Sequence, residues 1–268
     1  QKTAYEIMPS LVGSEMCIRD RTHGDHEIIV LAPDSVYECF WETIRGFNLS
    51  EKYRVPVVIL TDEVIAHMRE RLEIPSPDEV EIINRRKPDV PPEEFLPYSD
   101  KWGDVPPMAP YGSGYRHHVT GLAHDDTGFP THHPQKVQRL IDRLIKKIRN
   151  NVDDICKWEV KEREGAGVLV VAVGCVARSA MGVLYDHNFP IRVFRPITLW
   201  PFPEQGLTSA VEGMNAVVVA EMNTGQMFYE VQRIVGDKLP VHFLGKANGE
   251  IITPDEIMKK VMEVQGVH

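Results

Sequence analysis

Short apolar runs alternate with helix-like segments along much of this chain, and this alternation limits the folds that it can adopt. The first two apolar runs are residues 27–31 and 55–60. Between them, apolar side chains recur at helical spacing from Val36 to Phe47, after a cap at Asp34 or Ser35. Two buried strands joined by one helix form a βαβ unit in which the strands are parallel. We therefore expect an α/β fold.

The second half of the chain repeats the pattern. Its apolar runs are residues 168–173, 192–195, 216–220 and 241–244. Each run is followed by a helical segment, and the last of these is capped by Thr253 with Pro254 at its first position. This spacing predicts a small doubly wound sheet that opens at about Gly165. We expect residues 165–268 to form a domain that folds on its own.

A proline-rich stretch separates the two patterns. Ten of the twenty prolines fall within residues 75–130, which predicts an extended excursion over a surface and not a core. Pro134 then begins an amphipathic helix, with apolar residues from Val137 to Ile148 along one face and Lys and Arg on the other.

Composition excludes several classes of protein. The formal net charge of −9 argues against a nucleic-acid partner, because no basic stripe is present to neutralise phosphates. The longest apolar run, residues 167–175, is too short to span a bilayer, so no membrane partner is expected. Four widely spaced cysteines form neither a disulfide framework nor a zinc motif; they are Cys17, Cys39, Cys156 and Cys175. A reducing cytoplasm fits this pattern best.

The first 21 residues do not match the rest of the chain. Residues 1–7 can be reverse-translated into a sequencing adapter, and residues 11–21 into the transposase end of the same kind of library. The gap between them has about the length of a sample index. We expect residues 1–21 to be adapter-derived and to have no native structure, so that the native sequence begins near Thr22 and has lost an earlier part. The alternative is a natural disordered leader.

A loop rich in histidine suggests a metal site. His117, His118, His124, His132 and His133 lie close together, with Asp125 and Asp126. No pair has the spacing of a helical zinc motif, and no strand or helix is expected to fix the loop. A metal-binding protein that uses the His117–His133 loop stays open as an alternative, as does a non-catalytic interaction module. We expect no metal ligand in this chain.

Three turns could line a ligand site. His23-Gly24-Asp25 precedes the first strand, and a glycine between polar side chains suits a close approach of the backbone to a ligand. Residues 173–179 place Gly174 between a strand and a helix, but they lack the dinucleotide-binding glycine pattern. We interpret Cys175 there as a small buried residue. Residues 221–227 also follow a strand, where turn chemistry alone is the simpler interpretation.

Read in order, several of these segments resemble the α subunits of the 2-oxoacid:ferredoxin oxidoreductases. They are Thr22-His23-Gly24-Asp25-His26, Asn48-Leu49-Ser50-Glu51-Lys52-Tyr53-Arg54, Asp62-Glu63, Gly114-Tyr115-Arg116-His117-His118, Leu199-Trp200-Pro201-Phe202-Pro203 and Glu221-Met222-Asn223. The loop of residues 115–130 looks most like the branch that acts on 2-oxoglutarate.

The resemblance implies an architecture and a reaction. Residues 22–150 look like the C-terminal part of a truncated domain that binds the pyrimidine ring of thiamine diphosphate. Residues 165–268 look like a smaller, transketolase-C-terminal-like domain. The family decarboxylates a 2-oxoacid with thiamine diphosphate and Mg²⁺, forms an acyl-CoA, and passes electrons through iron–sulfur clusters to ferredoxin.

The resemblance also implies partners. The cofactor would be shared with a β subunit, and γ and ferredoxin-like δ subunits are further candidates. The chain has no closely spaced cysteine pair, so the clusters are expected on partner subunits only. The family's catalytic residues lie upstream of the part resembled here, and no catalytic residue is assigned. His23, Gly24 and Asp25 are the predicted cofactor-binding residues.

Overall fold

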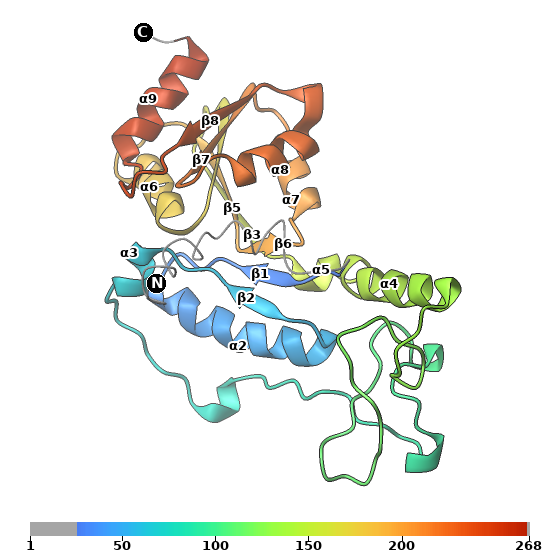
Figure 1. Ribbon diagram of the computed structural model, residues 1–268. Coiled ribbons are helices and arrows are strands. Elements are labelled where there is room, and N and C mark those ends of the chain that lie inside the picture. Colours follow the sequence, from blue (N-terminus) through green and yellow to red (C-terminus); the bar gives the residue numbers. More distant parts are fainter. Residues whose placement is uncertain (1–25, 267–268) are drawn as a thin grey trace, which may run out of the picture.

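The computed structural model of the chain describes residues 26–266. Two sheets lie one above the other in Figure 1. The lower sheet has the order β2-β1-β6, from β2 (Val57–Ile59), β1 (Ile29–Leu31) and β6 (Thr198–Trp200). β1 and β2 are parallel and are joined by α2 (Val36–Tyr53), so the predicted βαβ unit is confirmed.

Helix α2 packs on this sheet through a face different from the one marked by the apolar recurrence. Ser35 caps the helix by accepting a hydrogen bond from the Glu38 N–H at 3.2 Å. The buried side is centred on Gly46 and Leu49, where a Cβ on Gly46 would lie 3.4 Å from Val57 Cγ1. Phe47, at the end of the apolar recurrence, is 72% exposed. The recurrence therefore identified the helix but follows its outer side.

The upper sheet has the order β3-β5-β4-β7-β8. Its strands are β3 (Trp158–Glu162), β4 (Val168–Ala172), β5 (Arg192–Pro196), β7 (Ala216–Glu221) and β8 (Val241–Gly245). All neighbours are parallel except β3, which is an antiparallel edge strand. The four predicted strands are confirmed. β3 was not predicted, because four of its five residues are exposed and the segment reads as polar.

Helices cover both faces of the upper sheet. α6 (Gly174–Tyr185) and α9 (Pro254–Gln265) pack on one face, and α7 (Glu204–Ala210) and α8 (Gln226–Val235) on the other. Successive side chains of a strand point to opposite faces. Val170 and Val218 accordingly belong to the first core, whereas Val171 and Val219 belong to the second. This is the predicted doubly wound arrangement.

The proline-rich segment follows α3 (Glu63–His67) as a long excursion, seen at the lower right of Figure 1. Its regular elements are three short 3₁₀ helices, η2 (Pro77–Glu79), η3 (Pro92–Glu94) and η4 (Asp100–Trp102). Outside the excursion, a further 3₁₀ helix, η5 (Gly236–Lys238), follows α8. The chain then returns through α4 (Pro134–Arg149) and α5 (Val152–Ile155). Arg54 Nη1 donates to the carbonyl oxygens of Pro106 and Pro107 at 2.8 and 3.0 Å, which fastens the excursion to the end of α2. None of the helices between residues 26 and 266 has the length and apolar character needed to cross a membrane.

Strand β6 connects the two halves of the chain. It follows β5 in sequence but pairs antiparallel with β1, with Val30 opposite Trp200 and Leu31 opposite Thr198. Arg45 of α2 reinforces this junction by donating to Thr198 Oγ1 at 3.0 Å. The pairing argues against the expectation that residues 165–268 fold independently, because one of their strands completes the sheet of the first half.

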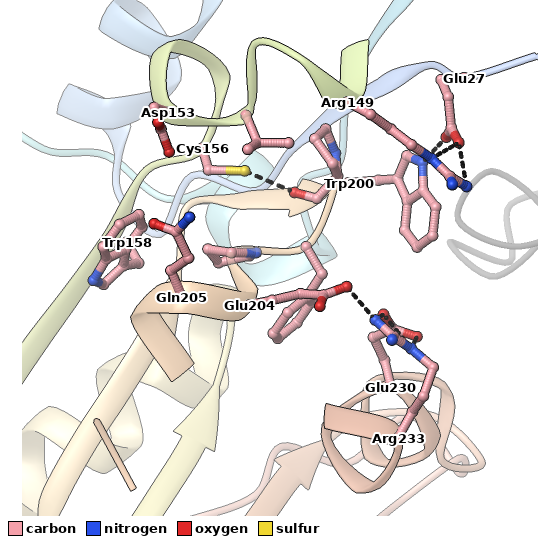
Figure 2. A pocket seen from close by; sticks show the side chains of 14 residues that line it. Glu27, Arg149, Asp153, Cys156, Trp158, Trp200, Glu204, Gln205, Glu230 and Arg233 are labelled. Atoms are coloured by element: carbon pink, nitrogen blue, oxygen red, sulfur yellow. Dashed lines mark hydrogen bonds and ion pairs between the residues drawn. The ribbon is translucent and has the colours of Figure 1, made fainter. Parts of the chain in front are cut away.

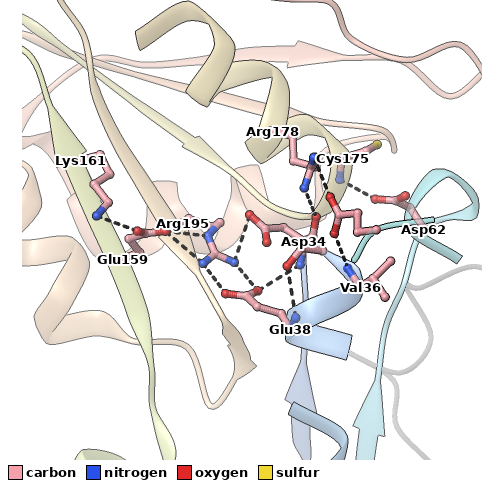
Figure 3. Close-up of polar contacts among 11 residues, drawn as sticks. Asp34, Val36, Glu38, Asp62, Glu159, Lys161, Cys175, Arg178 and Arg195 are labelled. Atoms are coloured by element: carbon pink, nitrogen blue, oxygen red, sulfur yellow. Dashed lines mark hydrogen bonds and ion pairs between the residues drawn. The ribbon is translucent and has the colours of Figure 1, made fainter. Parts of the chain in front are cut away.

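A buried arginine forms a second junction (Figure 3). The Arg195 side chain on β5 is only 4% exposed. It donates to both Glu38 carboxylate oxygens at 2.7 Å, to Glu159 at 3.0 Å, and lies 3.4 Å from Asp34. Asp34 and Glu38 belong to the first half, so two of the three carboxylates that balance the charge of Arg195 come from the other half of the chain.

We expect Arg195→Met to lower the free energy of unfolding by about 3–5 kcal/mol, because it leaves buried carboxylates without their cation. Urea denaturation is the measurement. Arg71→Met is the control, since Arg71 and its partner Glu73 are 87% and 82% exposed, and an exposed pair contributes about 0–1 kcal/mol. Equal, small losses for the two variants would show that Arg195 does not join the halves.

Asp34 gives the structure a predictable pH dependence. Burial raises the pKa of its carboxyl from 3.8 to about 6, against the attraction of Arg195. The folded state then binds a proton that the unfolded state releases, so the contribution of Asp34 to stability is present below about pH 4 and is lost as the pH rises through about 6. We expect Asp34→Asn to show a growing stability advantage over the unchanged protein across this window in urea midpoints. The exposed Asp78→Asn is the control, and a constant difference for Asp34→Asn would contradict the assignment.

Candidate functional site

The predicted cofactor residues His23, Gly24 and Asp25 lie outside the described residues, so the structure does not place them. The described chain begins beside them with His26 and Glu27. Glu27 is 5% exposed and lies two residues before the start of β1. Its carboxylate accepts hydrogen bonds from Trp200 Nε1 at 2.7 Å and from Arg149 Nη2 at 3.3 Å. The start of β1 is thus held from both β6 and α4.

Glu27 also lines a cleft of about 530 Å³ between the two sheets (Figure 2). Aromatic side chains provide much of the lining, from Trp158 on β3, Trp200 on β6 and Phe202. Trp158 lies against α7, where a Cβ on Gly206 would be 2.5 Å from the indole ring, so the glycine makes room for it. The cleft therefore depends on elements from both halves of the chain.

The charged groups at the cleft are paired with one another. Arg233 Nη2 lies 2.5 Å from a Glu204 oxygen and 2.6 Å from a Glu230 oxygen, which raises the pKa of the guanidinium. Burial raises the pKa of the Cys156 thiol to about 12, and the thiol donates to the Pro201 carbonyl at 3.3 Å. A thiol with such a pKa is not a nucleophile at neutral pH. The described lining suits binding and not covalent catalysis.

A second place where α/β proteins bind ligands is the carboxyl edge of the upper sheet, between β4 and β7, where the strand order reverses. Here the N-terminus of α6 is occupied by a carboxylate of the protein itself. Asp62 Oδ2, from the end of β2, accepts the Cys175 N–H at 2.6 Å, while Oδ1 accepts the Ile65 N–H at 2.9 Å. Gly174 has a φ of +55°, and a Cβ there would lie 2.3 Å from Asp62 Oδ2. Asp62 fills the position that an anionic ligand would take.

Side chains of the protein itself also accept the free N–H groups in the turn after β7. Glu221, 2% exposed, accepts the N–H groups of Met227 and Phe228 at 2.9 and 2.8 Å. Asn223 Oδ1 accepts the Gly225 N–H at 2.8 Å. The two turns considered from the sequence, residues 173–179 and 221–227, are therefore closed by internal side chains.

Cys175 lies in this closed region. It is 5% exposed, and its Sγ is 3.5 Å from Met222 Sδ. Burial, followed by the neighbouring Asp62, raises the pKa of the thiol to about 12. The interpretation of Cys175 as a small buried residue is confirmed.

The histidine loop does not converge on a centre. His118 stacks on Phe129, His117 meets Phe95 edge-on, and His124 packs on Tyr98. Asp125 is held by Thr127 and Lys136 at 2.5 and 3.0 Å. No group of three or more His, Cys, Asp or Glu side chains suited to a metal ion occurs within residues 26–266.

Sequence reasoning missed the part played by Glu27, Arg149 and Trp200. Glu27 was grouped with an apolar strand, and Trp200 was noted only within a motif. Asp62 was likewise noted only within a motif, and no pattern indicated that it would reach α6. These contacts join residues more than 100 positions apart, so local periodicity carries no signal for them.

Comparison with known proteins accounts for both halves. The thiamine diphosphate-binding family of the pyruvate flavodoxin/ferredoxin oxidoreductases matches residues 3–143, which is more than half of the chain. Core domain II of pyruvate:ferredoxin oxidoreductase matches residues 166–257. The first match begins inside the segment predicted to be adapter-derived. Because residues 1–25 are not described, the adapter origin stays a prediction.

Individual relatives agree with the family. The chain is 44% identical over 247 residues to the 2-oxoglutarate synthase subunit KorA of Methanothermobacter thermautotrophicus, covering 91% of this chain and 65% of that protein. It is 40% identical over 254 residues to KorA of Methanocaldococcus jannaschii, covering 93% and 67%. The chain thus spans about two thirds of the length of these relatives.

A solved structure shares the fold. It is a 2-oxoglutarate:ferredoxin oxidoreductase from Magnetococcus marinus with 2-oxoglutarate, coenzyme A and succinyl-CoA bound. The TM-score is 0.81 at 28% identity, and the match covers 92% of this chain and 44% of that one. The resemblance to the α subunits of 2-oxoacid:ferredoxin oxidoreductases is confirmed. The chain belongs to the thiamine diphosphate-binding family of the pyruvate flavodoxin/ferredoxin oxidoreductases and is similar to the KorA subunits of 2-oxoglutarate synthase.

Proposed function

We propose that this chain serves in the α subunit of a 2-oxoglutarate:ferredoxin oxidoreductase. The reaction consumes 2-oxoglutarate, coenzyme A and two oxidised ferredoxins, and yields CO₂, succinyl-CoA, two reduced ferredoxins and the proton of the coenzyme A thiol. The observation that carries the proposal is the 44% identity to KorA across 91% of the chain, which runs through both sheets and the excursion. Fold likeness alone would not suffice, because one fold supports many reactions.

The proposed cofactor is thiamine diphosphate with Mg²⁺, shared with a β subunit. When bound, thiamine diphosphate supplies the carbon nucleophile and the electron sink that decarboxylation of a 2-oxoacid requires. We propose that His23, Gly24 and Asp25 line its binding interface. Glu27 follows this segment directly and is anchored by Trp200 and Arg149. The role we assign to these described residues is to position the segment, not to react.

The remaining components are proposed for other chains. Cys39, Cys156 and Cys175 are separate free thiols, so we assign the iron–sulfur clusters to partner subunits. A β subunit is the first partner, and γ and ferredoxin-like δ subunits, ferredoxin and coenzyme A complete the proposed set. The reduced thiols also fit a cytoplasmic location.

The test is a chimera in which the region of M. thermautotrophicus KorA that aligns with this chain is replaced by this chain, produced with the other subunits of that enzyme. We expect reduction of ferredoxin that requires 2-oxoglutarate and coenzyme A together. Activity with 2-oxoglutarate should exceed that with pyruvate or 2-oxoisovalerate by about tenfold or more, since charge recognition of a second carboxylate discriminates strongly. A folded, assembled chimera that prefers another 2-oxoacid would overturn the substrate assignment.

The metal-binding alternative has its own test. We expect titration of the purified chain with Zn²⁺ to give the same calorimetric isotherm as a variant with His117, His124 and His132 changed to Gln. The His117 and His124 rings contact separate neighbours, and His132 is exposed. Loss of a stoichiometric binding step in the variant would revive the alternative.

A further inference from the structure

Helix α2 presents a second apolar side that faces away from the sheet. Tyr37 and Phe47 are 57% and 72% exposed, and Phe40, Trp41 and Ile44 between them are half-buried. The rings contact one another along the helix, with centroids 6.2 Å apart for Tyr37–Trp41 and 5.3 Å for Phe40–Trp41. A single exposed aromatic is ordinary, but a continuous stripe along several turns marks an interaction surface.

A strap of residues 70–83 runs beside this stripe and is fastened at both ends. At the N-terminal end of α2, Glu70 accepts the Val36 N–H at 2.9 Å. Toward the other end, Asn48 donates to the Glu81 carbonyl at 2.8 Å and accepts the Ile83 N–H at 2.9 Å. Figure 1 shows the strap, with η2 on it, passing along the outer side of α2. We call the stripe and the strap together the α2–strap face.

The strap adds exposed apolar side chains and negative charge. Ile74 and Ile82 are 79% and 71% exposed. Residues 70–83 contain five carboxylates and one arginine. That arginine, Arg71, pairs with Glu73. The α2–strap face is therefore an apolar centre with an acidic border.

Burial of the face would be worth a substantial free energy. Each large apolar side chain that passes from water into an apolar contact lowers the free energy of the complex. Interfaces have this layout, with an aromatic core inside a charged rim. A second copy of this chain is a poor occupant, because it would bring another acidic strap and a further net charge of −9.

We propose that the α2–strap face docks a partner protein whose contact surface is apolar and bordered by basic side chains. That the partner is another subunit of the oxidoreductase rests on the proposed function. The acidic border then steers and orients the partner, and the aromatic stripe of α2 provides the buried centre of the contact.

Binding of the chimera to the isolated remaining subunits, measured by biolayer interferometry, tests the proposal. We expect Tyr37→Asp and Phe47→Asp each to weaken binding about tenfold or more. Tyr185→Asp is the matched control, because Tyr185 is 58% exposed at the end of α6, away from the face. It should change binding less than about twofold.

A second pair of variants tests the charge and does not touch the aromatic residues. Asp78→Lys with Glu81→Lys should weaken binding, and the loss should shrink at high salt because the effect is electrostatic. The matched control changes Glu93 and Glu94, two exposed acids on η3, to Lys and so reverses their charge. Circular dichroism and thermal unfolding of each variant establish that it is folded.

The outcomes separate the inference from the proposed function. If the unchanged chimera binds and is active, and the face variants bind as tightly as it does, the inference is overturned while the proposed function stands. Dimerisation of the chain alone that Phe47→Asp abolishes would identify a second copy as occupant and also overturn it. A chimera that binds none of the subunits would overturn the inference and the proposed function together.

Discussion

The arrangement of the two halves depends on the buried guanidinium of Arg195. It lies on β5 of the upper sheet. Two of its three carboxylate partners, Asp34 and Glu38, lie at the start of α2, which packs on the lower sheet. An ion of this kind is tolerated inside a protein only with its partners in place. The pairing of β6 and β1 is a second contact that joins the two sheets. The ionised form of Asp34 is disfavoured in this group, since burial raises the pKa of its carboxyl to about 6.

The same principle operates at the helix termini. Asp62 occupies the N-terminus of α6 and Glu221 that of α8, where α/β proteins commonly hold an anionic ligand. Asp62 belongs to the first half of the chain, so its hydrogen bond from the Cys175 N–H at the start of α6 links the two halves. The upper sheet accordingly serves as a support, and the open cleft lies elsewhere, beside Glu27 and Trp200.

In helix α2, the side on which apolar residues recur in the sequence is not the side that packs on the sheet. The residues that recur at helical spacing, from Val36 to Phe47, were the signal for the helix. The sheet is nevertheless contacted by Gly46, Leu49 and Tyr53, because the glycine allows the helix to approach β2 closely. The helix is apolar on two sides, and within residues 26–266 only one of them is covered.

The sequence by itself determined the order and type of most elements, the α/β class and the family, because strands and helices differ in local periodicity and the family motifs are local as well. Several features were decided only by tertiary structure. They include the edge strand β3, the passage of β6 into the other sheet, and the contacts of Glu27, Asp62 and Arg195 with residues far along the chain. Periodicity reports which side of an element is apolar, not which neighbour it meets. Burial of a charge depends on groups that only the fold brings together, and this is why the network around Arg195 could not be read from its neighbours in sequence.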